Sequence, residues 1–124
     1  MNWTEPAPCL FLFDVDHTLE ISSGPISLRQ LQVLRDQGHI IGICGNWGFF
    51  TQQVSRWQDL VSILGPIGCA KHVMLQELSR EIGGLNAYVL VGNNEPGRSE
   101  DGWSAAEAGW RFVKEDAFSM EVCA

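Results

Sequence analysis

The sequence of 124 residues predicts an α/β protein in which a parallel β-sheet carries helices on both faces. Two observations lead to this class. Short, continuously apolar runs, which suit strands buried on both faces, alternate with segments whose apolar residues recur at helical spacing. Three of these apolar runs also end in an acidic residue or a glycine, at the end of the strand where parallel sheets bind ligands. We therefore expect a three-layer, Rossmann-like domain with right-handed crossovers.

The first half of the chain provides two buried strands and two helices. The strands are expected at Cys9–Phe13 and Ile40–Cys44. Between them, Ser27 is a suitable N-cap for a helix that ends at Gly38 and whose apolar side includes Leu28, Leu31 and Leu34. A second helix is predicted because apolar residues recur at helical spacing at Phe50, Val54, Trp57 and Val61.

The second half repeats the alternation of strands and helices. The segment Ile63–Ile67 contains Gly65 and Pro66, so it is either an edge strand or a loop. A third helix is expected from Lys71 to Gly83-Gly84, with an apolar side formed by Met74, Leu75, Leu78 and Ile82. The remaining elements are a buried strand, a short helix stopped by Gly109, and a last strand followed by a polar tail: Ala87–Val91, Trp103–Ala108 and Trp110–Val113.

Composition limits the kind of protein this can be. Hydrophobic residues make up 45 % of the chain, which favours a globular domain. Eight basic and fifteen acidic side chains give a formal charge of −7. That balance argues against nucleic acid as a partner, but it permits a small anionic substrate held by a local cation or a metal. No repeat or linker divides the sequence, so we expect one domain over residues 1–124.

The sequence also predicts a cytoplasmic protein. No apolar run approaches the roughly 18 residues that a membrane span requires. The beginning of the chain, MNWTEPAPC, has no lysine or arginine, so we expect no secretory signal. The four cysteines, at positions 9, 44, 69 and 123, form no CxxC pair and no zinc-ligand pattern. We interpret them as reduced thiols.

Two acidic residues follow the first strand in the stretch CLFLFDVDHTL. Asp14 and Asp16 are one residue apart, and His17 and Thr18 come directly after them. Two carboxylates this close repel each other unless a proton or a cation lies between them, and Mg²⁺ prefers such oxygen ligands. If the chain turns after Val15, one acid can serve as a nucleophile and the other as a proton donor. The alternative is that both acids only solvate the end of a strand.

Four segments in order resemble the motifs of the haloacid dehalogenase superfamily. The run FLFDVDHTL is similar to the first motif, an apolar strand followed by Asp-x-Asp-x-Thr. Ile40–Asn46 resembles the second motif, and Lys71 at the start of a helix matches the third. The segment YVLVGNN, followed by Asp101 and AAEAGWRFV, resembles the fourth motif and the elements after it. The resemblance extends over nearly the whole chain, from Cys9 to Phe118.

This resemblance implies a Mg²⁺-dependent, phosphatase-like hydrolase. Asp14 would attack phosphorus and form an aspartyl-phosphate, Asp16 would act as general acid and base, and Lys71 would neutralise negative charge. Such transfers depend on positioning and charge compensation. Mg²⁺ would be bound by Asp14, the backbone carbonyl of Asp16 and the fourth motif, in which the candidates are Asn93 and Asp101. The candidates for phosphate binding are Thr18, Gly45 and Asn46.

Two departures from the family pattern leave an alternative open. Gly45 stands where the family has a serine or threonine hydroxyl, and Asn93 stands where it has an aspartate. The candidates for the missing negative charge are Glu95, Glu100 and Asp101, and Glu95–Arg98 looks like an insertion, in which Arg98 is interpreted as a solvated charge. The alternative is a catalytically weak or inactive relative that binds phosphate, a metal or another protein.

The short connections predict a site without a cap domain. The gaps Leu19–Gly38 and Trp47–Ala70 each hold little more than one helix. An open site suggests a phosphorylated substrate that is bulky or macromolecular, or shielding by a second copy in a homo-oligomer. Trp47 is either a substrate platform or a local packing residue. We interpret Trp103 and Trp110, which flank the last short helix, as packing residues. His39 and His72 have no motif context and are interpreted as ordinary surface or helix residues.

Overall fold

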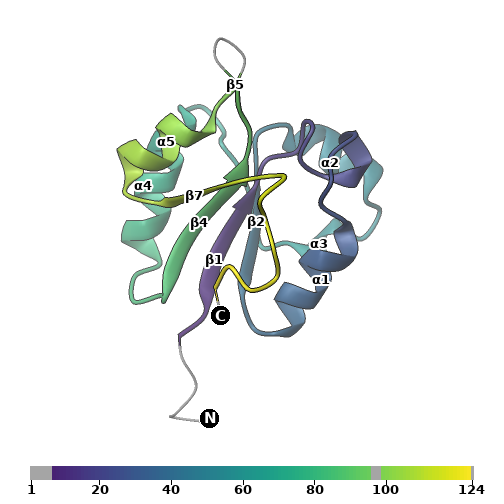
Figure 1. Ribbon diagram of the computed structural model, residues 1–124, viewed down its shortest axis with the longest axis horizontal. Coiled ribbons are helices and arrows are strands. Elements are labelled where there is room, and N and C mark those ends of the chain that lie inside the picture. The colour runs from purple at the N-terminus through teal and green to yellow at the C-terminus, as the bar shows by residue number, and fades with distance from the viewer. Residues whose placement is uncertain (1–6, 96–98, 124) are drawn as a thin grey trace.

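The structure, a computed structural model, describes residues 7–95 and 99–123 (Figure 1). Its centre is a five-stranded sheet in the order β3-β2-β1-β4-β7, and every pair of neighbouring strands is parallel. The strands are β1 (Cys9–Phe13), β2 (Ile40–Cys44), β3 (Ile63–Gly65), β4 (Ala87–Gly92) and β7 (Arg111–Lys114). The predicted α/β class, with a Rossmann-like parallel sheet, is confirmed.

Helices cover both faces of the sheet. Figure 1 shows α1 (Leu28–Asp36), α2 (Trp47–Gln53) and α3 (Trp57–Leu60) on one side. The other side carries α4 (Lys71–Glu81) and α5 (Asp101–Ala108). Ser27 caps α1 as expected, because its side chain accepts a hydrogen bond from the Gln30 backbone N–H and the Gln30 side chain reciprocates.

The alternation of side chains along β1 explains its continuous apolar run. Cys9, Phe11 and Phe13 face one core, where they meet residues of α1, α2 and α3. Leu10 and Leu12 face a second core, built with α4 and α5. Successive side chains of a strand point to opposite faces, so a strand covered on both sides must be apolar at every position.

The order of the strands determines where the site lies. The chain leaves β1 for β2 and β3 on one side, and then returns to the other side of β1 to form β4 and β7. The order of the strands therefore reverses between β1 and β4, and such a position is called a topological switch point. Parallel sheets bind ligands there, just beyond the carboxyl ends of the strands. Asp14 follows β1 and Asn93 follows β4, so both lie at this position.

The structure corrects several predicted elements. The second helix is two helices, α2 and α3, because Val54 adopts an extended conformation with φ −112° and ψ 99°. The segment after α3 is an edge strand, β3, and α5 begins at Asp101, two residues before the predicted start. A one-turn helix, η1 (Glu20–Ser22), was not predicted. Neither was a small hairpin formed by β5 (Asn94–Glu95) and β6 (Ser99–Glu100). Arg98 lies outside the described residues.

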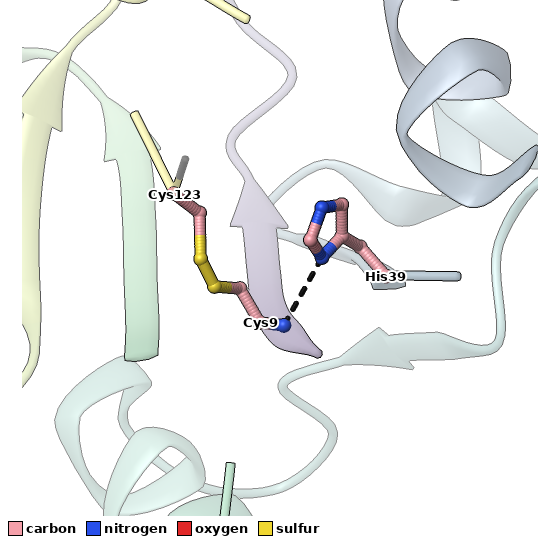
Figure 2. Close-up of side chains that lie close together, drawn as sticks. All are labelled: Cys9, His39 and Cys123. Atoms are coloured by element: carbon pink, nitrogen blue, oxygen red, sulfur yellow. Dashed lines mark hydrogen bonds between the residues drawn. A yellow bond between two sulfur atoms is a disulfide. The ribbon is translucent and has the colours of Figure 1, made fainter. Parts of the chain in front are cut away.

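A disulfide joins the two ends of the described chain. Cys9 at the start of β1 is bonded to Cys123 (Figure 2), whereas Cys44 and Cys69 are free. The prediction that all four cysteines are reduced is wrong for this pair. Disulfides persist mainly in oxidising compartments, so the argument from reduced thiols no longer supports a cytoplasmic location. None of the helices in residues 7–95 and 99–123 combines the length and apolar character that a membrane crossing requires.

His39, which was expected to be an ordinary surface or helix residue, is half-buried and lies beside this disulfide. Its Nδ1 accepts a hydrogen bond from the Cys9 backbone N–H at 3.1 Å (Figure 2). Burial lowers the pKa of His39, which favours the neutral ring that this bond requires. Among the residues that the structure describes, Cys9, His39 and Cys123 are the only three histidine, cysteine or acidic side chains whose ligand atoms all lie within 4.8 Å of one another. Both sulfur atoms are already bonded to each other.

Candidate active site

Asp14 is fixed at the carboxyl end of β1. Its backbone N–H donates to the Val91 carbonyl at 2.9 Å, which extends the pairing of β1 with β4 by one residue. The side chain is buried, with a relative exposure of the residue of 7 %. It faces a pocket of about 770 Å³ that also contains Asp16, Lys71, Asn93 and Asp101. The predicted catalytic and metal-binding residues therefore meet in one place.

Lys71 connects two carboxylates across this pocket. As the first residue of α4, it lies with its Nζ 2.6 Å from Asp101 Oδ1 and 3.7 Å from Asp14 Oδ1. Burial lowers the pKa of Lys71, but Cys44, the two carboxylates and the hydrogen bond to Asp101 outweigh it, so the pKa rises above its usual value. Lys71 therefore stays charged at any physiological pH. It is the cation expected from the sequence.

The small hairpin brings Asp101 to the site. Asn94 pairs with Glu100, so the residues just outside this pair, Asn93 and Asp101, lie next to each other. The Asn93 backbone N–H donates to Asp101 Oδ2 at 3.2 Å, and the Asp101 side chain is almost completely buried. Gly92 allows this approach, because a Cβ atom there would lie 2.2 Å from Asp101 Oδ2. Of the three candidate acids, Asp101 is thus the one placed at the centre, while Glu95 and Glu100 line the exposed side of the pocket.

The Asn93 side chain stands among oxygen atoms. Its Nδ2 lies 2.8 Å from the Asp16 carbonyl, 3.4 Å from Asp14 Oδ2 and 3.3 Å from Thr18 Oγ1. An amide nitrogen has only two hydrogens, so it cannot donate to all three oxygens at once. The partial positive charge of its N–H groups thus offsets part of the negative charge of the oxygen atoms that gather beside Asp14.

The carboxylate of Asp16 is separate from this oxygen cluster. It accepts a hydrogen bond from Asn46 Nδ2 at 3.1 Å and lies 3.5 Å from Ser22 Oγ. The next residue, His17, has a positive φ of 59° in the turn that follows Asp16. Asp16 therefore offers its carbonyl to the centre of the site and its carboxylate to the pocket.

The charge balance around Asp14 is unfavourable for its ionised form. Burial raises the pKa of Asp14, Lys71 lowers it and Asp101 raises it again, and the result is a pKa of about 7 instead of 3.8. Lys71 therefore does not offset the cost of burying the Asp14 carboxylate beside a second one. Additional positive charge at this position would restore an ionised Asp14.

The donor set suits a hard divalent cation. Carboxylate oxygens of Asp14 and Asp101 and the Asp16 carbonyl are the oxygen ligands that Mg²⁺ prefers. Asn93 would join them if its amide turned so that Oδ1, rather than Nδ2, faced the group. Burial and the nearby Asp101 carboxylate together raise the pKa of Asp14, and a cation beside it would offset both effects, so these residues fit the metal that the sequence motifs imply.

The phosphate-binding candidates are placed differently from expectation. Thr18 is completely buried and does not line the pocket, and its Oγ1 lies between the Asn93 amide and the Asp16 carbonyl. The backbone N–H of Gly45 donates to the Gly65 carbonyl and is not available to a ligand. Asn46 lines the pocket and caps α2 through its Oδ1, and the second hydrogen of its Nδ2 can reach an anion.

Gly45 is required by the position of Asp14. Its φ is +122°, and a Cβ atom would lie 2.4 Å from Asp14 Oδ1. A serine or threonine hydroxyl, as in the family pattern, therefore has no room on this backbone. The absence of this hydroxyl is a consequence of how closely β2 approaches Asp14.

We expect Gly45→Ala to displace Asp14 and to destabilise the fold. The strained backbone and the steric contact together should lower the free energy of unfolding by about 1–3 kcal/mol. Gly48→Ala is the matched control, because Gly48 lies in α2 and a Cβ atom there would have no neighbour within 4 Å, so this change should be neutral or slightly stabilising. Urea denaturation of the three proteins measures the difference. Equal stability of both variants would contradict the role given to Gly45.

The structure also defines the contacts of nearby aromatic residues. Trp47 is the first residue of α2, and its Nε1–H donates to the Pro66 carbonyl. Trp110 is buried, and its Nε1–H donates to the Leu75 carbonyl. Trp103, in contrast, is 50 % exposed and lines the pocket together with His72. Trp103 is therefore not simply a packing residue as predicted, whereas His72 is a helix residue as predicted and also borders the pocket. Helical periodicity alone could not reveal which side of α5 borders the pocket.

Comparison with protein-family models, curated proteins and solved structures found no match to this chain. The resemblance to the haloacid dehalogenase superfamily therefore depends on the four motifs and their order.

Proposed function

We propose that this protein is a Mg²⁺-dependent phosphomonoester hydrolase of the haloacid dehalogenase type. The observation that supports the proposal most strongly is the meeting of Asp14, Lys71 and Asp101 in one pocket at the switch point of the sheet. These residues come from three distant parts of the chain. Solvating the end of a strand would not require two buried carboxylates and a partly buried lysine.

In the first step, an Asp14 carboxylate oxygen attacks the phosphorus atom of the ester. A bond forms between that oxygen and phosphorus, and the bond from phosphorus to the ester oxygen breaks. Asp16 donates its proton to the departing oxygen, so the alcohol leaves neutral. Lys71 lies close enough to Asp14 to offset the negative charge that gathers on the phosphoryl group.

In the second step, water attacks the phosphorus atom of the aspartyl-phosphate. Asp16, now ionised, takes a proton from that water, and the bond between phosphorus and the Asp14 oxygen breaks. Inorganic phosphate leaves, and both aspartates return to their starting states. Asn46 is bonded to the Asp16 carboxylate and keeps it directed toward the pocket in both steps.

Asp14, Asp101, the Asp16 carbonyl and the Asn93 amide would hold Mg²⁺. When bound, this cation supplies positive charge that stabilises the transferred phosphoryl group. Asp101 has a second role in the proposal, since its hydrogen bond holds the Lys71 ammonium group in place.

The short connections favour an open site. Between β1 and β2 the chain forms only η1 and α1, and between β2 and α4 it forms only α2, α3 and β3. These elements pack against the sheet and leave the pocket accessible, which suits the proposed capless architecture. It also suits a substrate larger than a simple alkyl phosphate, or shielding by a second copy of the chain.

Hydrolysis of 4-nitrophenyl phosphate tests this function. The purified protein should release 4-nitrophenol in the presence of Mg²⁺, and a chelator should abolish the release. Restoring excess Mg²⁺ should restore it. Absence of turnover with several unrelated phosphomonoesters, at saturating Mg²⁺, would contradict the proposal.

One observation favours a second candidate, a phosphate- or metal-binding module with little or no turnover. The Asn93 amide donates toward Asp14 Oδ2 and the Asp16 carbonyl, where an oxygen ligand would help to bind a cation. If this arrangement persists, Mg²⁺ binds weakly. Asn93→Asp should then strengthen Mg²⁺ binding in calorimetry and raise the hydrolysis rate, whereas an unchanged affinity would remove the ground for this candidate.

A further inference from the structure

The indole of Trp103 borders the proposed phosphate site. Trp103 lies in the first turn of α5, two residues after Asp101, and is 50 % exposed. The other large exposed hydrophobic residue in the described part of the chain, Ile67, lines a different and more apolar depression. Trp103 is thus a large apolar surface within reach of a substrate that is bound at Asp14 and Lys71.

His72 holds this indole from one side. The two ring centroids are 5.0 Å apart, and the ring planes meet at 76°. His72 directly follows Lys71, and Trp103 closely follows Asp101, so the ion pair of Lys71 with Asp101 also fixes the relative position of the two rings. The aromatic wall formed by Trp103 and His72 is therefore attached to the charged centre and is oriented before a ligand arrives.

The pocket is larger than a phosphate group needs. Its volume of about 770 Å³ lies within the range typical of sites for small organic molecules. Phosphate bound at Asp14 would occupy only the inner part, and the aromatic wall borders the remainder. A planar ring is the group that an exposed indole binds most favourably.

The charges of the pocket restrict this ring further. Asp16, Glu95 and Glu100 line it in addition to the two inner carboxylates. Among the described residues that line the pocket, Lys71 is the sole lysine or arginine, and its ammonium group already forms an ion pair with Asp101. A leaving group with further phosphates or carboxylates would meet net repulsion. The ring should therefore be uncharged or positively charged.

We propose that Trp103 is a specificity-determining residue that stacks on a planar aromatic leaving group without negative charge. This inference depends on the proposed function and names the class of ester that the site takes. The phosphate would lie between Asp14 and Lys71, and the ring on the aromatic wall.

Kinetics with two esters tests the inference. The ratio of kcat/KM for 1-naphthyl phosphate to that for glycerol 2-phosphate is measured in the wild type, Trp103→Ala and Trp103→Phe. Trp103→Ala should reduce this ratio by about tenfold or more, mainly through a higher KM for the naphthyl ester, because stacking strengthens ground-state and transition-state binding alike. Trp103→Phe should retain most of the ratio, and Ile67→Ala, the control, should leave it unchanged. If Trp103→Ala lowers kcat/KM equally for both esters, or lowers it for neither, the inference is overturned.

A binding measurement separates this inference from the hydrolase proposal. The probe is (1-naphthylmethyl)phosphonate, which is not hydrolysable because a CH₂ group replaces the ester oxygen, and it is titrated into wild type and Trp103→Ala in the presence of Mg²⁺. Binding that is about tenfold weaker in the variant supports stacking even if no ester is turned over. Equal affinities overturn it, whatever the hydrolysis assay shows.

Discussion

Asp14→Asn should lower kcat for phosphomonoester hydrolysis by about a thousandfold or more, because it removes the attacking oxygen while keeping the shape of the side chain. Such a loss corresponds to about 4 kcal/mol of transition-state stabilisation. The assay is release of 4-nitrophenol with excess Mg²⁺, under conditions that detect the residual rate.

The fold should tolerate this substitution, which makes the result interpretable. Burial raises the pKa of Asp14 to about 7, so a neutral amide costs the folded protein no more than an ionised carboxylate does. In urea, Asp14→Asn should unfold at the same or a higher concentration than wild type at pH 8 without metal. Asp36→Asn is the matched control, since Asp36 is exposed at the end of α1 and away from the pocket. Activity of Asp14→Asn close to that of Asp36→Asn would exclude Asp14 as the nucleophile.

Cys123→Ser should lower the free energy of unfolding by about 2–4 kcal/mol, the largest effect on stability that we expect. The disulfide links residues 114 positions apart, so it restricts the unfolded chain over nearly its whole length. It also holds the C-terminal segment against the first core, where the Phe118 ring meets Phe13 edge-on with centroids 5.4 Å apart. Loss of the bond frees this segment as well.

Urea denaturation with and without a reducing agent measures the effect. The wild type should become less stable on reduction, and Cys123→Ser should not respond. Cys69→Ser is the control, because Cys69 is an exposed free thiol and its loss should change nothing. Titration of thiols in the unfolded, oxidised protein should find two, Cys44 and Cys69. Four thiols, or a wild type that is insensitive to reduction, would contradict the disulfide.

The sequence predicted those parts of the fold that depend on local pattern. The alternation of apolar runs with helical periodicity was enough for the sheet, because a strand such as β1 must be apolar at every position when both its faces are covered. The break between α2 and α3 was missed. The apolar spacing of Phe50, Val54 and Trp57 continues across it, and neither glycine nor proline marks it.

The candidate site could be predicted where its residues directly follow strands. It could be predicted less well where pairing between distant segments determines which residue reaches the pocket. Asp14 and Lys71 were identified by their motifs, but the choice of Asp101 over Glu95 and Glu100 depends on the register of a hairpin with two-residue strands. The disulfide joins Cys9 to a residue 114 positions away, a separation that carries no sequence signal. The exposure of Trp103 likewise depends on how α5 packs against α4.

Chemical trapping of the aspartyl-phosphate tests the central claim, that Asp14 is the nucleophile, most directly. The protein is mixed briefly with a phosphomonoester and Mg²⁺, quenched with acid and treated with borohydride, which reduces an acyl phosphate to the alcohol. Mass spectrometry of its peptides should then find Asp14 converted to homoserine, and it should find no conversion when substrate is omitted. Rapid turnover with Asp14 unmodified, or with the conversion at another acidic residue, would contradict the proposed mechanism.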